Sequence, residues 1–147
     1  MQEKGKEAIE EAVELIVEKL KVNPEEVAVL LYYPQEESLK FVYPSPLVDA
    51  GSIPITSSDS LAVRVMKSAK GFLSNNFQDV RHLGFFDRLT RNKGPILKLL
   101  AAPILKGGRV IGVIEVSCRQ PARNFTQEEL LFLEQVGELL GERLEEP

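Results

Sequence analysis

The stretch AAPILKGGRVIGVIEVS, residues 101–117, contains two apolar runs that are separated by Gly107 and Gly108. Adjacent glycines accept the positive φ angles of the tight turns that join antiparallel strands. The stretch therefore predicts a β-hairpin with strands at 96–105 and 109–119. Side chains along a strand alternate between the two faces of its sheet. In the second strand one face is almost wholly apolar, whereas the other begins apolar and ends polar: Ile111, Val113, Glu115, Ser117 and Arg119.

The mixed face indicates that another element covers its first half, because a face open to water would be polar along its whole length. One candidate is the helix predicted at 57–71, with Ser57 or Ser58 as its N-cap and Gly71 as its stop. The other candidate is the segment 77–95. Such a cover leaves either a small-molecule pocket or a fully packed second core.

Amphipathic helices are predicted at both ends of the chain. The first covers residues 5–21, where apolar residues recur at three- and four-residue spacing. The last begins with a capping box formed by Thr126 and Glu129. Gly137 and Gly141 disfavour the helix interior, and their spacing predicts that another helix, the first one, approaches them closely.

The remaining patterns complete an antiparallel sheet. β-Branched and aromatic residues predict a hairpin with strands at 27–33 and 38–43, and 72–76 is predicted as a short strand. The prolines of 44–56 predict a loop or an irregular edge. Hairpins with helices segregated on the sheet faces define an α+β domain.

Composition narrows the function classes. The 147 residues predict one domain, residues 1–147, and the net charge of −4 argues against a nucleic-acid partner. No apolar stretch is long enough for a membrane span, and the charged N-terminus does not resemble a signal peptide, so we expect a cytoplasmic protein. The chain has one cysteine, Cys118, which cannot form an internal disulfide or a cysteine-rich metal site.

The C-terminal half resembles a GAF domain. The matching features are Ala102-Pro103-Ile104 in a strand, a glycine turn, Ile-Gly-Val at 111–113, and a Phe-Thr-x-Glu-Glu opening at 125–129. Upstream, VMKSAKGFLSNN and FFDRLTRNKGPILKLLAAPI also resemble segments of that family. The resemblance implies a six-stranded antiparallel sheet, with terminal helices that often dimerise on one face and a small-molecule pocket on the other.

The known ligands of the family do not single out one for this chain, so the cofactor is left unknown. Of the pattern typical of cyclic-nucleotide binding, Phe125 matches and Glu129 is a conservative fit, but the Asn-Lys pair falls on Cys118 and Arg119. Bilin attachment in the family uses a cysteine beside a histidine, whereas His82 is far from Cys118 in sequence. His82 is a candidate haem ligand or an ordinary surface residue.

An enzyme of this family, the free methionine sulfoxide reductase, needs an attacking and a resolving thiol. The single cysteine removes that mechanism, and we expect no catalytic activity. We also expect no metal site, since no cluster of histidine, cysteine and carboxylate side chains surrounds His82.

The candidate ligand-binding residues are aromatic or polar side chains near the proposed pocket: Phe72, Asn75, His82, Phe85, Arg88, Glu115 and Ser117. Arg88 and Asn75 together could hold a small anion or a carboxylate. In the alternative interpretation, Asn75 and Asn76 cap the following segment and Arg88 is solvated.

Two functions follow from this interpretation. The first is a regulatory module that binds a small cytosolic metabolite and signals through a partner effector protein. The second is a structural dimerisation or partner-docking module with a degenerate pocket. A second face filled by Phe72, Phe85, Phe86 and Leu100 would favour the second.

The terminal helices have more apolar width than one sheet face can cover. We expect a homodimer through these helices, with Ile16 and Phe132 at the interface. The alternative is that the 44–56 loop folds over the surplus within one chain.

Overall fold

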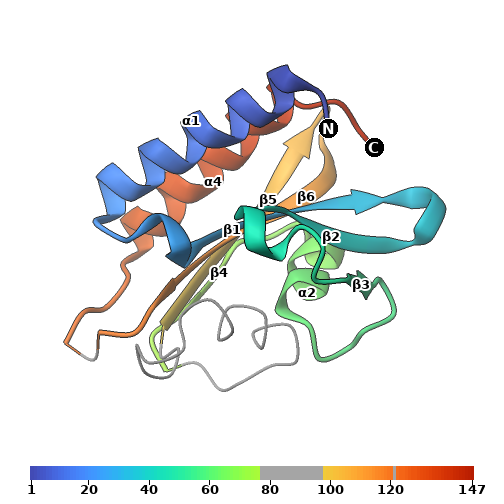
Figure 1. Cartoon of the computed structure of the whole chain (residues 1–147). Coiled ribbons are helices and arrows are strands. Elements are labelled where there is room, and N and C mark those ends of the chain that lie inside the picture. Colours follow the sequence, from blue (N-terminus) through green and yellow to red (C-terminus); the bar gives the residue numbers. More distant parts are fainter. Residues whose placement is uncertain (77–97, 121) are drawn as a thin grey trace.

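The structure is a computed structural model, and it describes residues 1–76, 98–120 and 122–147 (Figure 1). The described residues form a six-stranded antiparallel sheet with the strand order β3-β2-β1-β6-β5-β4. The strands are β1 Val27–Tyr33, β2 Ser38–Tyr43, β3 Ser52–Pro54, β4 Phe72–Ser74, β5 Lys98–Lys106 and β6 Arg109–Cys118.

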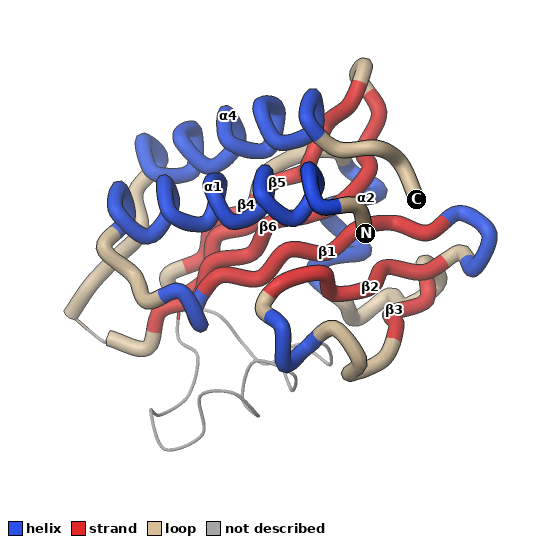
Figure 2. The backbone as a smooth tube through the Cα atoms, turned by 45° about the horizontal axis from the view of Figure 1, so that its top comes forward, coloured by secondary structure: helices blue, strands red, loops and turns tan. Residues whose placement is uncertain are grey.

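The helices lie on both faces of this sheet. The terminal helices, α1 Glu3–Leu20 and α4 Gln127–Arg143, lie side by side on one face (Figure 2), and the short α2, Leu61–Ser68, lies on the other. The described connections include single turns of 3₁₀-helix: η1 Pro24–Glu26 between α1 and β1, η2 Pro34–Glu36 between β1 and β2, and η3 Ser45–Leu47 between β2 and β3. The α+β class, the six strands and the position of the terminal helices confirm the expected architecture.

The glycine turn forms as its sequence predicts. Gly107 and Gly108 have φ angles of 58° and 82°, and β5 pairs with β6 from Lys98 to Lys106. The pairing is irregular between Ile104 and Leu105. This irregularity shifts the alternation of side chains between the two sheet faces. Ile111 was predicted on the face of Val113 and Glu115, but it packs in the core under the terminal helices.

Helix α2 is shorter than the predicted 57–71. Its N-cap is Ser60, whose Oγ accepts a hydrogen bond from the Val63 N–H at 3.3 Å, so the prediction of Ser57 or Ser58 was wrong. The helix ends at Ser68, and Ala69 adopts the left-handed conformation with φ 57°. Ser60 follows the two predicted serines within the sequence SSDS at 57–60, and N-cap propensity alone does not choose among the three serines.

Gly71 therefore does not stop α2, and packing gives it another role. A Cβ atom at Gly71 would lie 2.7 Å from Glu134 Oε2 and 2.9 Å from Leu130 Cδ1, both on α4. The absence of a side chain lets the chain that enters β4 pass directly beneath α4. This glycine is needed for a close approach rather than for a helix end.

Helix α4 begins at the predicted capping box. The Glu129 N–H donates to Thr126 Oγ1 at 3.2 Å, and the Thr126 N–H donates to Glu129 Oε1 at 2.9 Å. Gly137 and Gly141 face the sheet, where a Cβ atom would collide with the carbonyl oxygens of Pro103 and Leu105 on β5. The prediction that α1 approaches these glycines was wrong, because the close partner is the strand beneath them.

Only some of the apolar side chains that were predicted to exceed what one sheet face can cover are exposed on the terminal helices. Ile16 is fully buried in the core between α1 and the sheet, so it cannot form a dimer contact as predicted. Phe132 is half-buried and packs at the edge of that core. The exposed large apolar side chains of the helix pair are instead Leu15, Leu131 and Leu139, each more than half exposed.

Candidate functional site

The face of the sheet beneath α2 carries a buried carboxylate at its centre. Glu115 lies on β6 in register with Ala28 of β1 and Ala101 of β5, and its side chain is fully buried. Both alanines belong to the core that α2 covers, so Glu115 faces the same side. The residues directly opposite Glu115 are thus small, whereas Leu30 and Leu99 stand diagonal to it on the same two strands.

A carboxylate is costly to bury unless other groups compensate it. Glu115 takes part in a hydrogen-bonding or electrostatic interaction, so it is not an isolated charge. Chemically, the group can accept hydrogen bonds or balance a positive charge. Among the described residues, it is the one buried acidic side chain.

Ser117 lies two residues further along the same face and is also fully buried. Its Oγ donates a hydrogen bond to the Glu26 carbonyl oxygen at 3.4 Å, which ties the end of β6 to η1. The hydroxyl oxygen retains acceptor capacity. Glu115 and Ser117 thus form the polar half of the face, as the alternation along 109–119 predicted.

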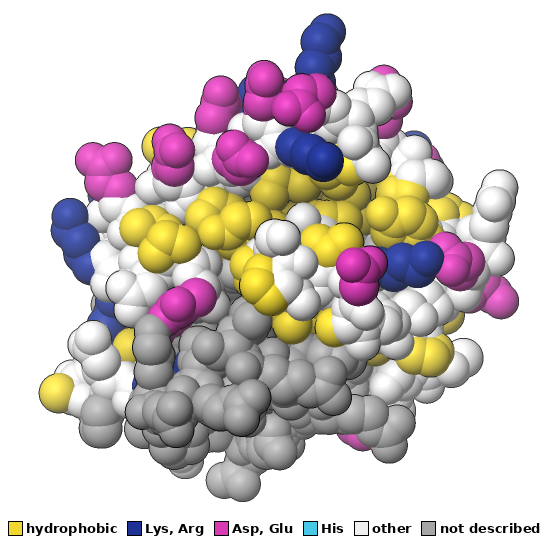
Figure 3. Space-filling model, in the orientation of Figure 1, with side chains coloured by type: hydrophobic (Ala, Val, Ile, Leu, Met, Phe, Trp, Pro, Cys, Tyr) yellow, Lys and Arg dark blue, Asp and Glu magenta, His cyan; other side chains and the backbone are white. Residues whose placement is uncertain are grey.

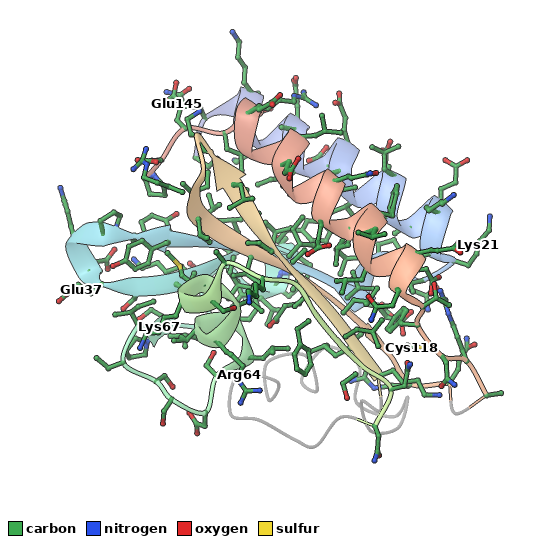
Figure 4. All side chains as sticks on the ribbon, turned by 180° about the vertical axis from the view of Figure 1, so that it is seen from behind. Lys21, Glu37, Arg64, Lys67, Cys118 and Glu145 are labelled. Atoms are coloured by element: carbon green, nitrogen blue, oxygen red, sulfur yellow. The ribbon has the colours of Figure 1, made fainter. Side chains whose placement is uncertain are left out.

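Phe72 and the apolar half of the face are packed. Phe72 is in register with Ala101 and contacts the core under α2, to which α2 contributes Leu61 and Val65. Viewed from behind, α2 lies in front of the sheet, and Arg64 and Lys67 lie on its exposed side (Figure 4). Leu100 points to the other face, beneath the terminal helices, and does not fill this site.

Asn75 has a structural role that its sequence context did not reveal. Its Oδ1 accepts a hydrogen bond from the Phe125 N–H at 2.8 Å, and its Nδ2 donates to the Phe125 carbonyl oxygen at 3.0 Å. Both ends of the amide are therefore used on one backbone residue, 50 positions away. These two bonds use Oδ1 and one N–H of Nδ2, so the second N–H is not accounted for by them. Arg88, the other group predicted to hold an anion, lies outside the described residues.

The candidates His82, Phe85 and Arg88, together with Phe86, lie outside the described residues. Cys118 is buried beneath the terminal helices, on the face opposite Glu115, and its Sγ accepts a hydrogen bond from the Gln120 N–H at 3.5 Å (Figure 4). This environment is that of a packing residue rather than of an exposed nucleophile.

Sequence reasoning missed Lys98, a buried cation at the start of β5. Its Nζ donates a hydrogen bond to the Gln120 carbonyl oxygen at 3.0 Å, and the residue is 4% exposed. A lysine directly before a long apolar strand is a weak signal, because most lysines at such positions are solvated.

Within the described parts of the chain, no three histidine, cysteine or acidic side chains gather as a metal site would require. No helix among these residues is long and apolar enough to cross a bilayer.

The antiparallel sheet, with two terminal helices on one face and a covered polar centre on the other, defines a class of small α+β domains. The family model for the GAF domain matches residues 6–145, and the chain belongs to that family. The sequence resemblance stated above is thereby confirmed. No curated protein matches the chain in sequence.

Solved structures show the same fold at low sequence identity. The GAF domain of the Acinetobacter phosphoenolpyruvate-protein phosphotransferase is 16% identical, with a TM-score of 0.66, and the match covers 96% of this chain and 92% of that one. A GAF domain/HD domain protein from Geobacter sulfurreducens is 15% identical, with a TM-score of 0.69 and coverages of 93% and 89%.

A third similar structure is the GAF domain of a two-component sensor histidine kinase from Bacillus halodurans. It is 19% identical with a TM-score of 0.63, and the match covers 90% of each chain. GAF domains thus occur in sensor and signalling proteins, which supports a regulatory role for this fold.

Proposed function

We propose that the chain is a regulatory GAF domain that senses a small cytosolic molecule and has no catalysis of its own. It acts in the cytoplasm and passes its signal to an effector protein. The observation that supports ligand binding is the buried carboxylate of Glu115 between Ala28 and Ala101, on the face that α2 covers.

The chemistry of this face favours one class of ligand. A molecule that reaches Glu115 and Ser117 meets a carboxylate and a hydroxyl oxygen, and both groups accept hydrogen bonds. Asn75 is held by Phe125 through its Oδ1 and one N–H, so at most one donor of its amide is left for an anion. The preferred ligand is therefore a small molecule with N–H donors or an amine, rather than a carboxylate or a phosphate.

Native mass spectrometry tests this function directly. The purified protein is incubated with the small-molecule fraction of a cell extract, desalted, and weighed under native and denaturing conditions. We expect the wild type to retain a defined additional mass that the Glu115→Gln variant loses, because the amide places a donor where the carboxylate accepts. Glu138→Gln, an exposed change on α4, is the matched control and should retain that mass.

Thermal unfolding of both variants shows that each is folded. If the wild type retains no small molecule, or if Glu115→Gln retains the same one with equal occupancy, the sensing function at this face is rejected.

A second proposed property is self-association through the terminal helices. Leu15 and Leu139 line a groove of about 280 Å³ between α1 and α4, and Leu131 is exposed on the same pair. Exposed leucines beside such a groove are typical of an interface. The homodimer proposed here uses these leucines in place of Ile16, with Phe132 at the margin.

A further inference from the structure

The sheet face that carries the terminal helices is not fully covered by them. Two adjoining hollows, of about 640 and 300 Å³, lie between α1 and strand β2 and share Glu10 and Tyr43. We call them together the α1/β2 groove. Its apolar lining includes Tyr33, Val42, Tyr43, Val17, Pro24 and Val48. Figure 3 shows this lining as a band of hydrophobic side chains below α1.

The geometry of the layers explains why the groove exists. Helix α4 packs on β5 and α1 on β1, which are two strands apart in the sheet. Two strand spacings, about 9.6 Å, match the usual distance between packed helices. The sheet continues beyond β1 to β2, where Val42 and Tyr43 are half-buried against the core. No helix covers these two residues in the described structure.

One wall of the groove is negatively charged. Glu10, Glu14 and Glu18 follow one another at four-residue intervals on α1, so they form a row on one side of the helix. All three are exposed, and none forms an ion pair with a described residue. Figure 3 shows acidic side chains above the hydrophobic band.

The field of this row reaches the groove. Burial raises the pKa of the Tyr43 phenol above its usual value, and the negative charge of Glu10 raises it further. The other rim is mixed: Lys40 is held by Glu36 at 2.6 Å and lies over the Tyr33 ring, while Asp49 also lines the groove. On α1 itself, the exposed Lys6 lines the groove one turn before Glu10.

We propose that the α1/β2 groove is a docking site for a basic amphipathic segment of a partner protein. Apolar side chains of that segment would cover Tyr33, Val42 and Tyr43, and its Lys or Arg residues would pair with the acidic row. A second copy of this chain fits poorly, because a two-fold axis at the groove would bring two acidic rows together. An anionic membrane surface would be repelled by the same charges.

A synthetic peptide probes the site. We would use a fluorescein-labelled helical peptide of about 15 residues, with leucine at the core spacing and lysine elsewhere, and its glutamate counterpart. Fluorescence anisotropy should show binding of the lysine peptide alone. Amide chemical-shift changes in the full chain should centre on Tyr33, Val42 and Tyr43.

The decisive variant is Glu10→Gln/Glu14→Gln/Glu18→Gln, which should weaken binding at least about tenfold, a factor that corresponds to 1.4 kcal/mol. The matched control, Glu128→Gln/Glu138→Gln/Glu142→Gln, removes the same charge from exposed positions of α4 and should retain affinity.

Three results would overturn the proposal: equal losses in the two variants, shifts centred on other elements, or tighter binding of the glutamate peptide. Self-association that the α1 variant strengthens would assign the groove to a second copy instead and would also overturn it. The proposal does not depend on a ligand at Glu115, which lies on the opposite face.

Discussion

Asn75 is the residue whose individual contribution the structure defines most clearly. Its amide satisfies both the N–H and the carbonyl oxygen of Phe125, immediately before the N-cap of α4. It therefore joins the end of β4, at the sheet edge, to the start of the last helix. A backbone group that is left without a partner on burial destabilises the folded state by about 1–3 kcal/mol.

We expect Asn75→Ala to lower the free energy of unfolding by about 1–3 kcal/mol, because it removes both hydrogen bonds from Phe125. Urea denaturation measures this change from the transition midpoint at unchanged slope. Asn76→Ala is the control, since that side chain is exposed, and its effect should stay within about 0.5 kcal/mol. Equal stability of Asn75→Ala and the wild type would show that the two bonds contribute nothing.

The two hydrogen bonds between Asn75 and Phe125 also show which part of the site the sequence could not predict. The alternation along 109–119 correctly placed Val113, Glu115 and Ser117 on one face, because a strand has a fixed period of two. No local pattern connects Asn75 with Phe125, which is 50 residues away. Long-range hydrogen bonds of this kind depend on how whole elements come together.

At the scale of elements, local chemistry predicted hairpins and caps well. The strands at 27–33 and 38–43, the glycine turn and the Thr126 capping box all form as their residues indicate. The errors arose where packing chose among locally equivalent options. Such errors include the start of α2 at Ser60 and the face of Ile111, which the strand irregularity at Ile104 and Leu105 decides.

Gly141 tests the contact between α4 and the sheet. We expect Gly141→Ala to destabilise the fold by about 1–3 kcal/mol, because its Cβ would meet the Leu105 carbonyl oxygen, a backbone atom that cannot rotate away. In an isolated helix the same change is favourable by about 1 kcal/mol. Thermal and urea unfolding measure the net effect.

Gly5→Ala in α1 is the matched control. A Cβ atom there meets only side-chain atoms, at 3.1 Å from Met1 Cγ and 3.6 Å from Leu144 Cδ2, so this variant should be neutral or slightly more stable. A Gly141→Ala protein as stable as Gly5→Ala would mean that α4 can move off β5 at little cost.

At the scale of the whole molecule, the terminal helices decide the oligomeric state. We expect the wild type to sediment as a dimer, and Leu15→Glu/Leu139→Glu to shift it to the monomer, because the change places charges in the groove between α1 and α4. Analytical ultracentrifugation across a concentration series measures the equilibrium.

Val48→Glu is the control for this shift, since Val48 is exposed near η3 and lines the α1/β2 groove rather than the groove between α1 and α4. Circular dichroism verifies that both variants remain folded. A wild type that is monomeric at high micromolar concentration contradicts the homodimer, and so does a dimer that tolerates both glutamates.

The seating of α4 on β5 has a mechanical consequence. At Gly137 and Gly141 no side chain separates the helix from the strand, so the two backbones approach each other directly at these positions, between the buried side chains of Leu133, Val136 and Leu140. Helix α1 rests on the sheet through full side chains such as Ile16 and Leu20, which can change rotamer and absorb a small displacement. A displacement of β5 would therefore move α4 with it as a rigid body. The displacement that reaches α1 would be smaller, because the side chains beneath α1 can change rotamer.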